Sequence, residues 1–466
     1  MREKVHFMGI AGSGLAPIAI IAKSMGFDVS GCDISDSTYY AHELKNNGID
    51  IQVGHSADHL KDADILAITP AVYDYNPDHP ELLEGQRRGI VMTWQEFSGK
   101  YLQKDKKVVA ICGTHGKSST TALTGLMMEH AGLDPIVEAG TIIREWGAGY
   151  RLANSDYFVV EADEFNNNFL NYHPSYIIFN NMEMDHPEFF KDEDEIKQSY
   201  VNFIKNMVNE KLLIVNFDNP GTREILEMAK DWILENGVTI AGYCKDKSVV
   251  PAWTNADIHT YEIKEATPNG SIFVIDGTET CEIGILGDYN VQNAMGVYCL
   301  SKALNVDINN FKETIKAFHG IGRRMEKKYE DDSITIYDDY GHHPTEIAAV
   351  FKALKDVYTD KTVVGIFEPH QISRLKLFVD EFVDAFKIPD VILVTKTFEG
   401  REARKHLTPM DMNILKDRVG DSFTYIEDFD DLAKYVKENY PSDAVIIVCG
   451  AGYSYKLTEK LVDYYK

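Results

Sequence analysis

A short loop that combines two glycines, a lysine and several hydroxyl groups has the composition of a phosphate-binding loop. It reads Gly113-Thr114-His115-Gly116-Lys117-Ser118-Ser119. The glycines permit tight turns and a close approach of the backbone, the amides at the start of a following helix face anionic oxygens, and Lys117 adds a positive charge. Ser118 can offer its hydroxyl to Mg²⁺. The strict spacing GxxxxGK[ST] would place glycine where the chain has Ile111, so an ordinary glycine-capped turn remains the alternative.

Two apolar segments would position this loop. Residues Val108–Cys112 form a short apolar run typical of a buried strand, and Thr120–His130 are apolar at helical spacing. A strand, a glycine-bearing loop and a helix in this order are the context that a phosphate-binding loop requires. We therefore predict that residues 113–119 bind the phosphates of ATP.

Acidic side chains end the next predicted strand of the same sheet. The strand at 155–160 is followed by Glu161-Ala162-Asp163-Glu164, and the strand at 176–180 by the polar stretch at 181–186. Ligands bind at the carboxyl edge of parallel sheets, and Mg²⁺ prefers oxygen ligands. Glu161 is therefore the first candidate for a magnesium ligand beside Lys117. A solvated acidic loop is the alternative, because the chain has 73 Asp and Glu residues.

A second glycine-rich loop follows the first predicted strand. Gly9, Gly12 and Gly14 come directly after Val5–Met8, and Asp33 lies 19 residues beyond Gly14 (33 minus 14). Taken alone, this arrangement resembles a dinucleotide fingerprint, which leaves an NAD(P)-dependent oxidoreductase as a rival class. The spacing is GxxGxG, however, and the fingerprint requires GxGxxG.

The pattern along the chain predicts an α/β protein of three domains. Apolar runs alternate with helical stretches in residues 1–104 and again in 323–466, which indicates Rossmann-like N-terminal and C-terminal domains. Residues 105–322 predict a P-loop ATPase-like central domain with a mostly parallel sheet. Within it, the segment 238–286 is expected to be antiparallel, because it contains the turn pairs Asn269-Gly270 and Asp276-Gly277.

The composition favours a soluble cytoplasmic protein that binds neither nucleic acid nor membrane. The formal net charge of −26 opposes binding to a phosphate backbone. No stretch reaches the ~18 apolar residues of a membrane span, and no apolar signal region precedes the first strand. The cysteines contain no CxxC pair, which argues against disulfides and a structural zinc site. They are Cys32, Cys112, Cys244, Cys281, Cys299 and Cys449.

Taken together, these motifs resemble those of the Mur ligase family of peptidoglycan synthesis, and most closely its alanine-adding branch. The resemblance spans nearly the whole chain, and ordered motifs in all three domains are more specific than any one of them. They are His6–Gly14, Gly113–Ser119, Glu161–Glu164, Asp185-His186, Gly287–Asn293, Arg323-Arg324, Asp338–Thr345 and Glu368–His370.

The resemblance implies a role for each matched residue. For ATP it implies Gly113, Thr114, His115, Gly116, Lys117, Ser118, Ser119, Asn290, Asn293, Arg324 and Asp339, with the two asparagines at the adenine. For Mg²⁺ it implies Ser118, Glu161 and His186, and for the UDP-sugar Gly9, Gly12, Gly14 and Asp33. His343, His370 and Arg374 would approach the incoming amino acid. His342 and His343 could equally start the helix at Pro344, and Arg374 could form a surface ion pair.

The implied reaction joins the carboxylate of UDP-N-acetylmuramate to the amine of L-alanine through an acyl phosphate, in a monomer or homodimer. Gln371 stands where some alanine-adding members carry a second arginine. A ligase that attaches a preformed peptide of the L-Ala-D-Glu-diaminopimelate type therefore remains an alternative, as does a non-catalytic UDP-sugar sensor. No lysine occupies the position near Tyr200 and Val201 where other branches carry a carbamylated lysine, which favours the alanine-adding branch and its tripeptide-attaching relative.

Overall fold

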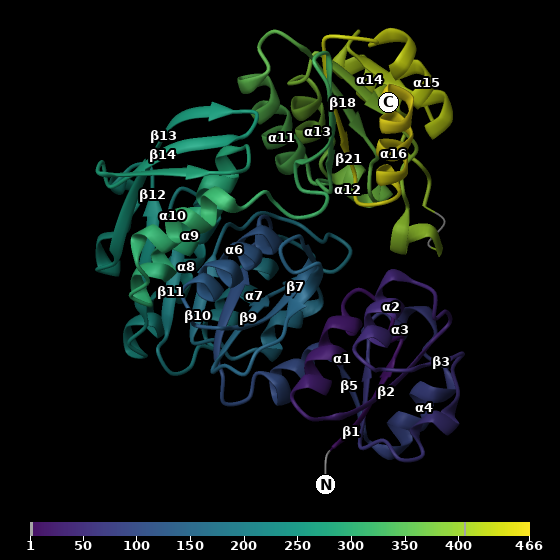
Figure 1. Cartoon of the computed structure of the whole chain (residues 1–466), viewed down its shortest axis with the longest axis vertical. Coiled ribbons are helices and arrows are strands. Elements are labelled where there is room, and N and C mark those ends of the chain that lie inside the picture. The colour runs from purple at the N-terminus through teal and green to yellow at the C-terminus, as the bar shows by residue number, and fades with distance from the viewer. Residues whose placement is uncertain (1–2, 405–406) are drawn as a thin grey trace.

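A computed structural model describes residues 3–404 and 407–466, which form three α/β domains, each around its own sheet (Figure 1). The N-terminal domain (purple to blue) and the C-terminal domain (green to yellow) both adjoin the central one. The predicted α/β fold class is confirmed. The predicted boundaries, after residues 104 and 322, fall between the last strand of one sheet and the first strand of the next. As limits of folding units they stay predictions.

The N-terminal sheet has five parallel strands in the order β3-β2-β1-β4-β5. The order reverses beside β1, so the glycine loop after β1 lies at the switch point where such sheets bind ligands. Helix α1 is apolar on all sides and belongs to an apolar cluster that continues into the central domain. The elements are β1 (Lys4–Met8), α1 (Leu15–Ser24), β2 (Asp28–Asp33), α2 (Tyr39–Asn46), β3 (Ile51–Val53), η1 (Ala57–Leu60), β4 (Ile65–Ile68), α3 (Val72–Tyr75), α4 (Pro80–Arg88), β5 (Val91–Thr93), α5 (Trp94–Phe97) and η2 (Ser98–Leu102).

The central sheet has ten strands in the order β15-β14-β13-β12-β11-β10-β6-β9-β7-β8. Its middle strands are buried on both faces: α6 and α9 cover one, α7 and α8 the other. The elements are β6 (Lys107–Cys112), α6 (Lys117–His130), β7 (Ile136–Ile143), β8 (Ala148–Arg151), β9 (Tyr157–Glu161), η3 (Phe165–Asn171), β10 (Tyr176–Phe179), α7 (Glu193–Ile204), β11 (Leu212–Asn216), α8 (Pro220–Glu235), β12 (Thr239–Cys244), η4 (Lys247–Val249), η5 (Ala252–Thr254), β13 (Asp257–Thr267), β14 (Gly270–Ile275), β15 (Glu279–Ile283), α9 (Asp288–Ala303) and α10 (Ile308–Ala317).

Two predictions for this domain need correction. The antiparallel part begins at β13, because β12 runs parallel to both β11 and β13. The turns at Asn269-Gly270 and Asp276-Gly277 do join β13, β14 and β15 as predicted. The helix after the phosphate loop begins at Lys117, three residues earlier than its apolar pattern suggested, because the polar residues 117–119 form its first turn.

The C-terminal sheet has the order β16-β17-β21-β18-β19-β20, and its edge strand β16 is antiparallel. Helices α11 and α13 pack on one face, α15 and α16 on the other. The elements are β16 (Glu326–Glu330), β17 (Ile334–Asp339), α11 (Pro344–Val357), β18 (Thr362–Phe367), α12 (Ile372–Leu377), α13 (Val379–Phe386), β19 (Val391–Val394), η6 (Gly400–Arg404), α14 (Asn413–Val419), β20 (Phe423–Tyr425), α15 (Phe429–Asn439), β21 (Ala444–Cys449) and α16 (Ser454–Tyr465).

The hairpin of β7 and β8 contacts both outer domains. Tyr39 donates a hydrogen bond to the carbonyl of Gly147 (2.7 Å), and Arg144 forms an ion pair with Glu326 (3.0 Å). The three domains therefore meet around one side of the central sheet. Within the described ranges, no helix is both long and apolar enough to cross a membrane.

Candidate active site

The phosphate loop connects β6 to α6 and has the backbone that its glycines permit. Gly113 and Gly116 have φ of 137° and 79°, in the region that favours glycine. A Cβ at Gly116 would lie 2.4 Å from Oδ1 of Asn293, so no other residue fits without a shift. Because α6 begins at Lys117, the first-turn amides have no helical acceptor and can bind an anion.

Lys117 is held at this loop by a buried acid. Its Nζ lies 2.8 Å from Oε2 of Glu164 and 2.6 Å from the carbonyl of Gly113, and Glu164 is fully buried. Burial would lower the pKa of Lys117, but Glu164 and Asp163 outweigh it and raise the pKa above its usual value. The loop therefore holds a fixed ammonium group at neutral pH.

Oxygen ligands suited to magnesium lie beside this lysine. Ser118 donates a hydrogen bond to Oε1 of Glu161 (3.2 Å), and the amide of Gly140 donates to Oε2 (3.0 Å). The ligand atoms of Asp163, Glu164 and His186 also lie within 4.8 Å of one another. Mg²⁺ binds such oxygen groups and few of them. The donor set at Ser118 and Glu161 therefore fits the ion.

His186 is a less simple ligand than the resemblance implies. Burial lowers its pKa, but Asp185, Glu188 and Glu164 outweigh burial and raise the pKa to about 9. The ring is therefore protonated at neutral pH and would have to lose a proton before it could bind a metal. Its role as a magnesium ligand stays a prediction.

A cavity of about 280 Å³ opens between the phosphate loop, the strand ends and α9. Amide side chains dominate one part of its wall: Asn216 donates to Oε1 of Gln292 (3.3 Å) and to the carbonyl of Asn180 (2.9 Å). Asn293 lines the cavity. Its Nδ2 donates a hydrogen bond to Oδ1 of the buried Asn290 (3.3 Å), which orients the Asn293 side chain. Arg324, Asp339 and Glu346 close the cavity from the third domain.

A second cavity, of about 600 Å³, lies where the three domains meet. Ser13 and Gly14 border it from the N-terminal glycine loop, and Arg323 and Tyr340 from the third domain. Its central-domain wall is acidic, with Glu138, Glu161 and Asp163. Ser118 and Arg324 line both cavities, so the two spaces meet at the phosphate loop.

Arg374 joins the third domain to the central one. Its side chain is 1% exposed, and Nη2 and Nε donate to Oδ1 of Asp185 (2.7 and 3.2 Å). Nη1 lies 2.9 Å from Nδ1 of His370. Burial would raise the pKa of Asp185, but His186 and Arg374 hold it well below its usual range. A surface ion pair, the alternative for Arg374, is therefore wrong.

The histidine pair before Pro344 does start a helix. Nδ1 of His343 accepts a bond from the amide of Thr345 (3.4 Å), and Glu346 completes a capping box. The helix-start interpretation of His343 is therefore confirmed. Its Nε2 is buried and has no hydrogen-bond partner among the described residues. A catalytic role for this atom stays a prediction.

His115 ties the phosphate loop to the same helix start. Its ring nitrogens lie 3.3 Å from Oε1 of Glu346 and 3.4 Å from Oε2 of Glu183. Burial lowers the pKa of His115, but the two carboxylates outweigh it and raise the pKa to about 10. The loop and α11 are therefore held together by a buried charge network.

Asp33 helps to hold the N-terminal glycine loop. The amide of Ala11 donates to Oδ2 (2.9 Å), and that of Ile34 to Oδ1 (2.7 Å). The amides of Gly9 and Ile10 both donate to the carbonyl of Cys32 (2.8 and 3.1 Å). Gly14 caps α1 and borders the second cavity. The contacts of Gly9, Gly12, Gly14 and Asp33 with a UDP-sugar stay predictions.

Several residues of the two cavities were missed in the sequence. Asn216 ends β11, so the rule that selected Glu161 at the end of its strand would also have found it. Glu346 lies three residues after His343, which is the spacing of a capping box, so this rule would have found it. Glu138 lies inside β7, where no sequence signal distinguishes a buried acid.

Glu138 gives a pH-dependent prediction. Burial, with the charges of Glu161 and Asp163, raises its pKa from 4.5 to about 8. Because the folded pKa is the higher one, the protonated acid stabilises the fold fully below pH 4.5, and this contribution is lost as pH rises through about 8. Glu138→Gln resembles the protonated form. We expect the Tm of Glu138→Gln, measured by thermal unfolding without added metal, to equal that of the wild type at about pH 5. At about pH 9 we expect it to exceed the wild-type Tm by several degrees.

The exposed Glu265→Gln is the control for this experiment, because it removes a solvated carboxylate. We expect its Tm difference from the wild type to be the same at both pH values. An equally constant difference for Glu138→Gln would contradict the raised pKa.

Comparison with known proteins agrees with this geometry along the whole chain. Three models match in succession: "Mur ligase family, catalytic domain" over residues 4–103, "Mur ligase middle domain" over 111–301, and "Mur ligase, glutamate ligase domain" over 323–452. A UDP-N-acetylmuramate--L-alanine ligase from Caldicellulosiruptor saccharolyticus is 32% identical, covering 99% of this chain and 98% of the relative. One from Sulfurihydrogenibium is 31% identical over the same shares.

Solved structures give the same result for the fold. The UDP-N-acetylmuramate-alanine ligase of Thermotoga maritima matches with a TM-score of 0.77 and 25% identity over 99% of both chains. A murein peptide ligase from Psychrobacter arcticus matches with a TM-score of 0.68 and 20% identity, over 99% of this chain and 98% of that one. At that identity the second match shows a shared fold only.

Proposed function

Because the chain belongs to the Mur ligase family, we propose that it uses ATP to join the carboxylate of UDP-N-acetylmuramate to the amine of L-alanine. The family resemblance seen in the sequence is thereby confirmed. The proposed reaction consumes ATP and supplies a precursor of peptidoglycan, and we propose that it takes place in the cytoplasm.

The observation that carries this proposal is the meeting of the two cavities at Ser118 and Arg324. The first cavity, with its amide wall and phosphate loop, suits ATP, and the second leads from the N-terminal glycine loop to the same point. A carboxylate in the second cavity would therefore approach the terminal phosphate of a nucleotide in the first. An oxidoreductase would not need a phosphate loop here, so we set that alternative aside.

The chemistry takes two balanced steps. In the first step a carboxylate oxygen of the sugar attacks the γ-phosphorus of ATP. The bond between the γ-phosphorus and the oxygen that bridges it to the β-phosphate breaks, and ADP leaves. The uncharged amine of alanine then attacks the acyl carbon, phosphate leaves, and the amine loses a proton as the amide forms. The first step brings two anions together, so positive charge at the meeting point is the main requirement.

The chain supplies that charge from two sides. Lys117 and the first-turn amides of α6 face the phosphates, and Arg324 approaches from the third domain. Bound Mg²⁺, held at Ser118 and Glu161, would neutralise further phosphate charge. The buried contacts of Arg374 with Asp185 and of His115 with Glu346 keep the third domain over the site. A third domain held there would limit the access of water that could hydrolyse an acyl phosphate.

Release of ADP tests this proposal. We expect it only when ATP, Mg²⁺, UDP-N-acetylmuramate and the amine are all present, with ¹⁸O from a labelled sugar carboxylate recovered in the phosphate. ADP release without transfer of ¹⁸O would exclude the acyl phosphate. Absence of ADP release with all substrates present would support a sugar sensor.

Glu161→Gln tests the magnesium site. The change keeps the shape but removes the charge, so we expect the Mg²⁺ concentration for half-maximal rate to rise by at least about tenfold. Glu145→Gln, at an exposed position of the neighbouring hairpin, is the control and should not shift the titration. An unchanged Mg²⁺ dependence for Glu161→Gln would move the metal site elsewhere.

A further inference from the structure

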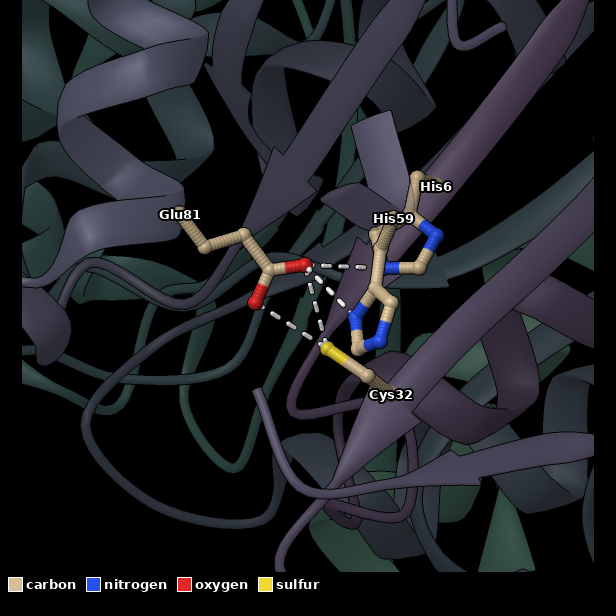
Figure 2. Close-up of side chains that lie close together, drawn as sticks. All are labelled: His6, Cys32, His59 and Glu81. Atoms are coloured by element: carbon tan, nitrogen blue, oxygen red, sulfur yellow. Dashed lines mark hydrogen bonds and ion pairs between the residues drawn. The ribbon is translucent and has the colours of Figure 1, made fainter. Parts of the chain in front are cut away.

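Six side chains of the N-terminal domain form a cluster of potential metal ligands that lies outside the proposed ligase site. Four of them have ligand atoms within 4.8 Å of one another: His6 on β1, Cys32 on β2, His59 on η1 and Glu81 on α4 (Figure 2). His55 and His79 complete the cluster through a second group with Glu81. It lies between the sheet and α4, away from the phosphate loop.

The four side chains point toward a common centre (Figure 2). Oε1 of Glu81 lies 3.0 Å from Nε2 of His6, 3.4 Å from Nδ1 of His59 and 3.3 Å from Sγ of Cys32. Zinc bonds of about 2.0–2.1 Å to nitrogen and about 2.3 Å to sulfur place tetrahedral ligand atoms roughly 3.3–3.6 Å apart. The three distances from Glu81 are therefore close to the ligand spacing of a tetrahedral site.

Two histidine nitrogens in the cluster lack ordinary partners. Nε2 of His6 and Nδ1 of His59 are buried and have no hydrogen-bond partner of good geometry among the described residues, although both are near Glu81. Nδ1 of His6 lies 2.9 Å from the hydroxyl of Ser30. Such a partner on the second ring nitrogen fixes a histidine ligand and leaves the first nitrogen for a metal.

An ion could reach the cluster from one side. His6, Cys32 and Glu81 are fully buried, but the side chains of His55 and His59 are 20% and 19% exposed. A cysteine binds a metal as its thiolate, so the Cys32 thiol would have to lose its proton. Binding would release this proton to solvent as the sulfur–metal bond forms.

We propose that His6, Cys32, His59 and Glu81 bind a zinc-type divalent ion that stabilises the N-terminal domain. The site joins β1, β2, η1 and α4, and the carbonyl of Cys32 accepts both amides of Gly9 and Ile10. An ion at Cys32 therefore also fixes the start of the glycine loop. Cysteine spacing argued against a structural zinc site, but spacing cannot detect ligands that only the fold brings together. The proposal does not depend on the ligase activity.

Titration of the full-length, metal-free chain with Zn²⁺ and with Co²⁺ tests the site, in excess Mg²⁺ to occupy the catalytic position. We expect one equivalent of either ion to bind, one thiol proton to be released, Tm to rise, and Co²⁺ to give a thiolate charge-transfer band. Cys32→Ser should abolish the band and weaken Zn²⁺ binding on the order of 100-fold. Cys281→Ser, at another buried thiol, should change neither.

His59→Gln provides a second variant at the partly exposed rim, where loss of the fold is not expected. It should keep the charge-transfer band but weaken Zn²⁺ binding to a similar degree. Stoichiometric binding that survives both Cys32→Ser and His59→Gln would place the ion elsewhere and overturn the proposal. So would a wild-type chain that takes up no Zn²⁺, in which case the cluster is only a buried polar network.

Discussion

Replacement of Lys117 by alanine is expected to lower the rate of ATP-dependent ligation by on the order of 10³-fold, measured as kcat for ADP release. The physical reason is the loss of the one ammonium group that the phosphate loop fixes beside the nucleotide. The retained amides of α6 can still bind phosphate, so we expect KM for ATP to change less than kcat.

The partner of Lys117 decides how this experiment is controlled. Glu164 is fully buried, and loss of Lys117 would remove its nearest cation and leave only His186, 3.9 Å away, which lowers stability. The double variant Lys117→Met, Glu164→Gln removes both charges and should recover the Tm but not the rate. Lys107 begins the strand that leads to the phosphate loop and forms an ion pair with Glu210 at the surface. Lys107→Ala removes this ion pair and should retain full activity. A Lys117 variant that folds and turns over ATP normally would show that the loop is not catalytic.

Arg374→Ala is expected to lower kcat/KM by roughly 10²-fold, because a broken buried ion pair costs about 3 kcal/mol or more. The change leaves the carboxylate of Asp185 buried, without its arginine partner, at the interface between the third domain and the central one. We therefore expect the closed arrangement to become less populated and kcat/KM to fall for all three substrates. Steady-state kinetics with each substrate varied in turn measures this.

Two comparisons separate this role from the one implied by the resemblance. If Arg374 instead binds the carboxylate of the amino acid, Arg374→Ala should raise KM for alanine alone. Arg418→Ala, which removes an exposed pair with Asp380 in the same domain, is the matched control and should retain full activity. Activity of Arg374→Ala within about twofold of the wild type would contradict both roles.

Local pattern was sufficient to predict the three mostly parallel sheets and the strand, glycine loop and helix around Lys117. The runs at β6, β10 and β21 are apolar throughout because they are buried on both faces, which makes such strands easy to recognise. The hairpin of β7 and β8 was missed, because Gly140 and Gly149 interrupt its strands and its residues show no regular alternation.

The site residues also divide into those that the sequence could predict and those that it could not. Lys117, Ser118 and Glu161 lie next to strand ends, so their proximity could be predicted from one sheet edge. The Arg374–Asp185 and His115–Glu346 contacts join residues of different domains. Their geometry depends on how the domains dock, which no local pattern encodes. The four residues of the proposed zinc site lie within one domain but come from four separate elements, so again no local pattern brings them together.

Mass analysis of products tests the proposed activity most directly. The chain would be incubated with ATP, Mg²⁺, UDP-N-acetylmuramate and an equimolar mixture of L-alanine, glycine, L-serine and the tripeptide L-Ala-D-Glu-diaminopimelate. We predict one main product, UDP-N-acetylmuramoyl-L-alanine, formed with one ADP and one phosphate. A main product that carries the tripeptide, or no sugar product at all, would contradict the proposal.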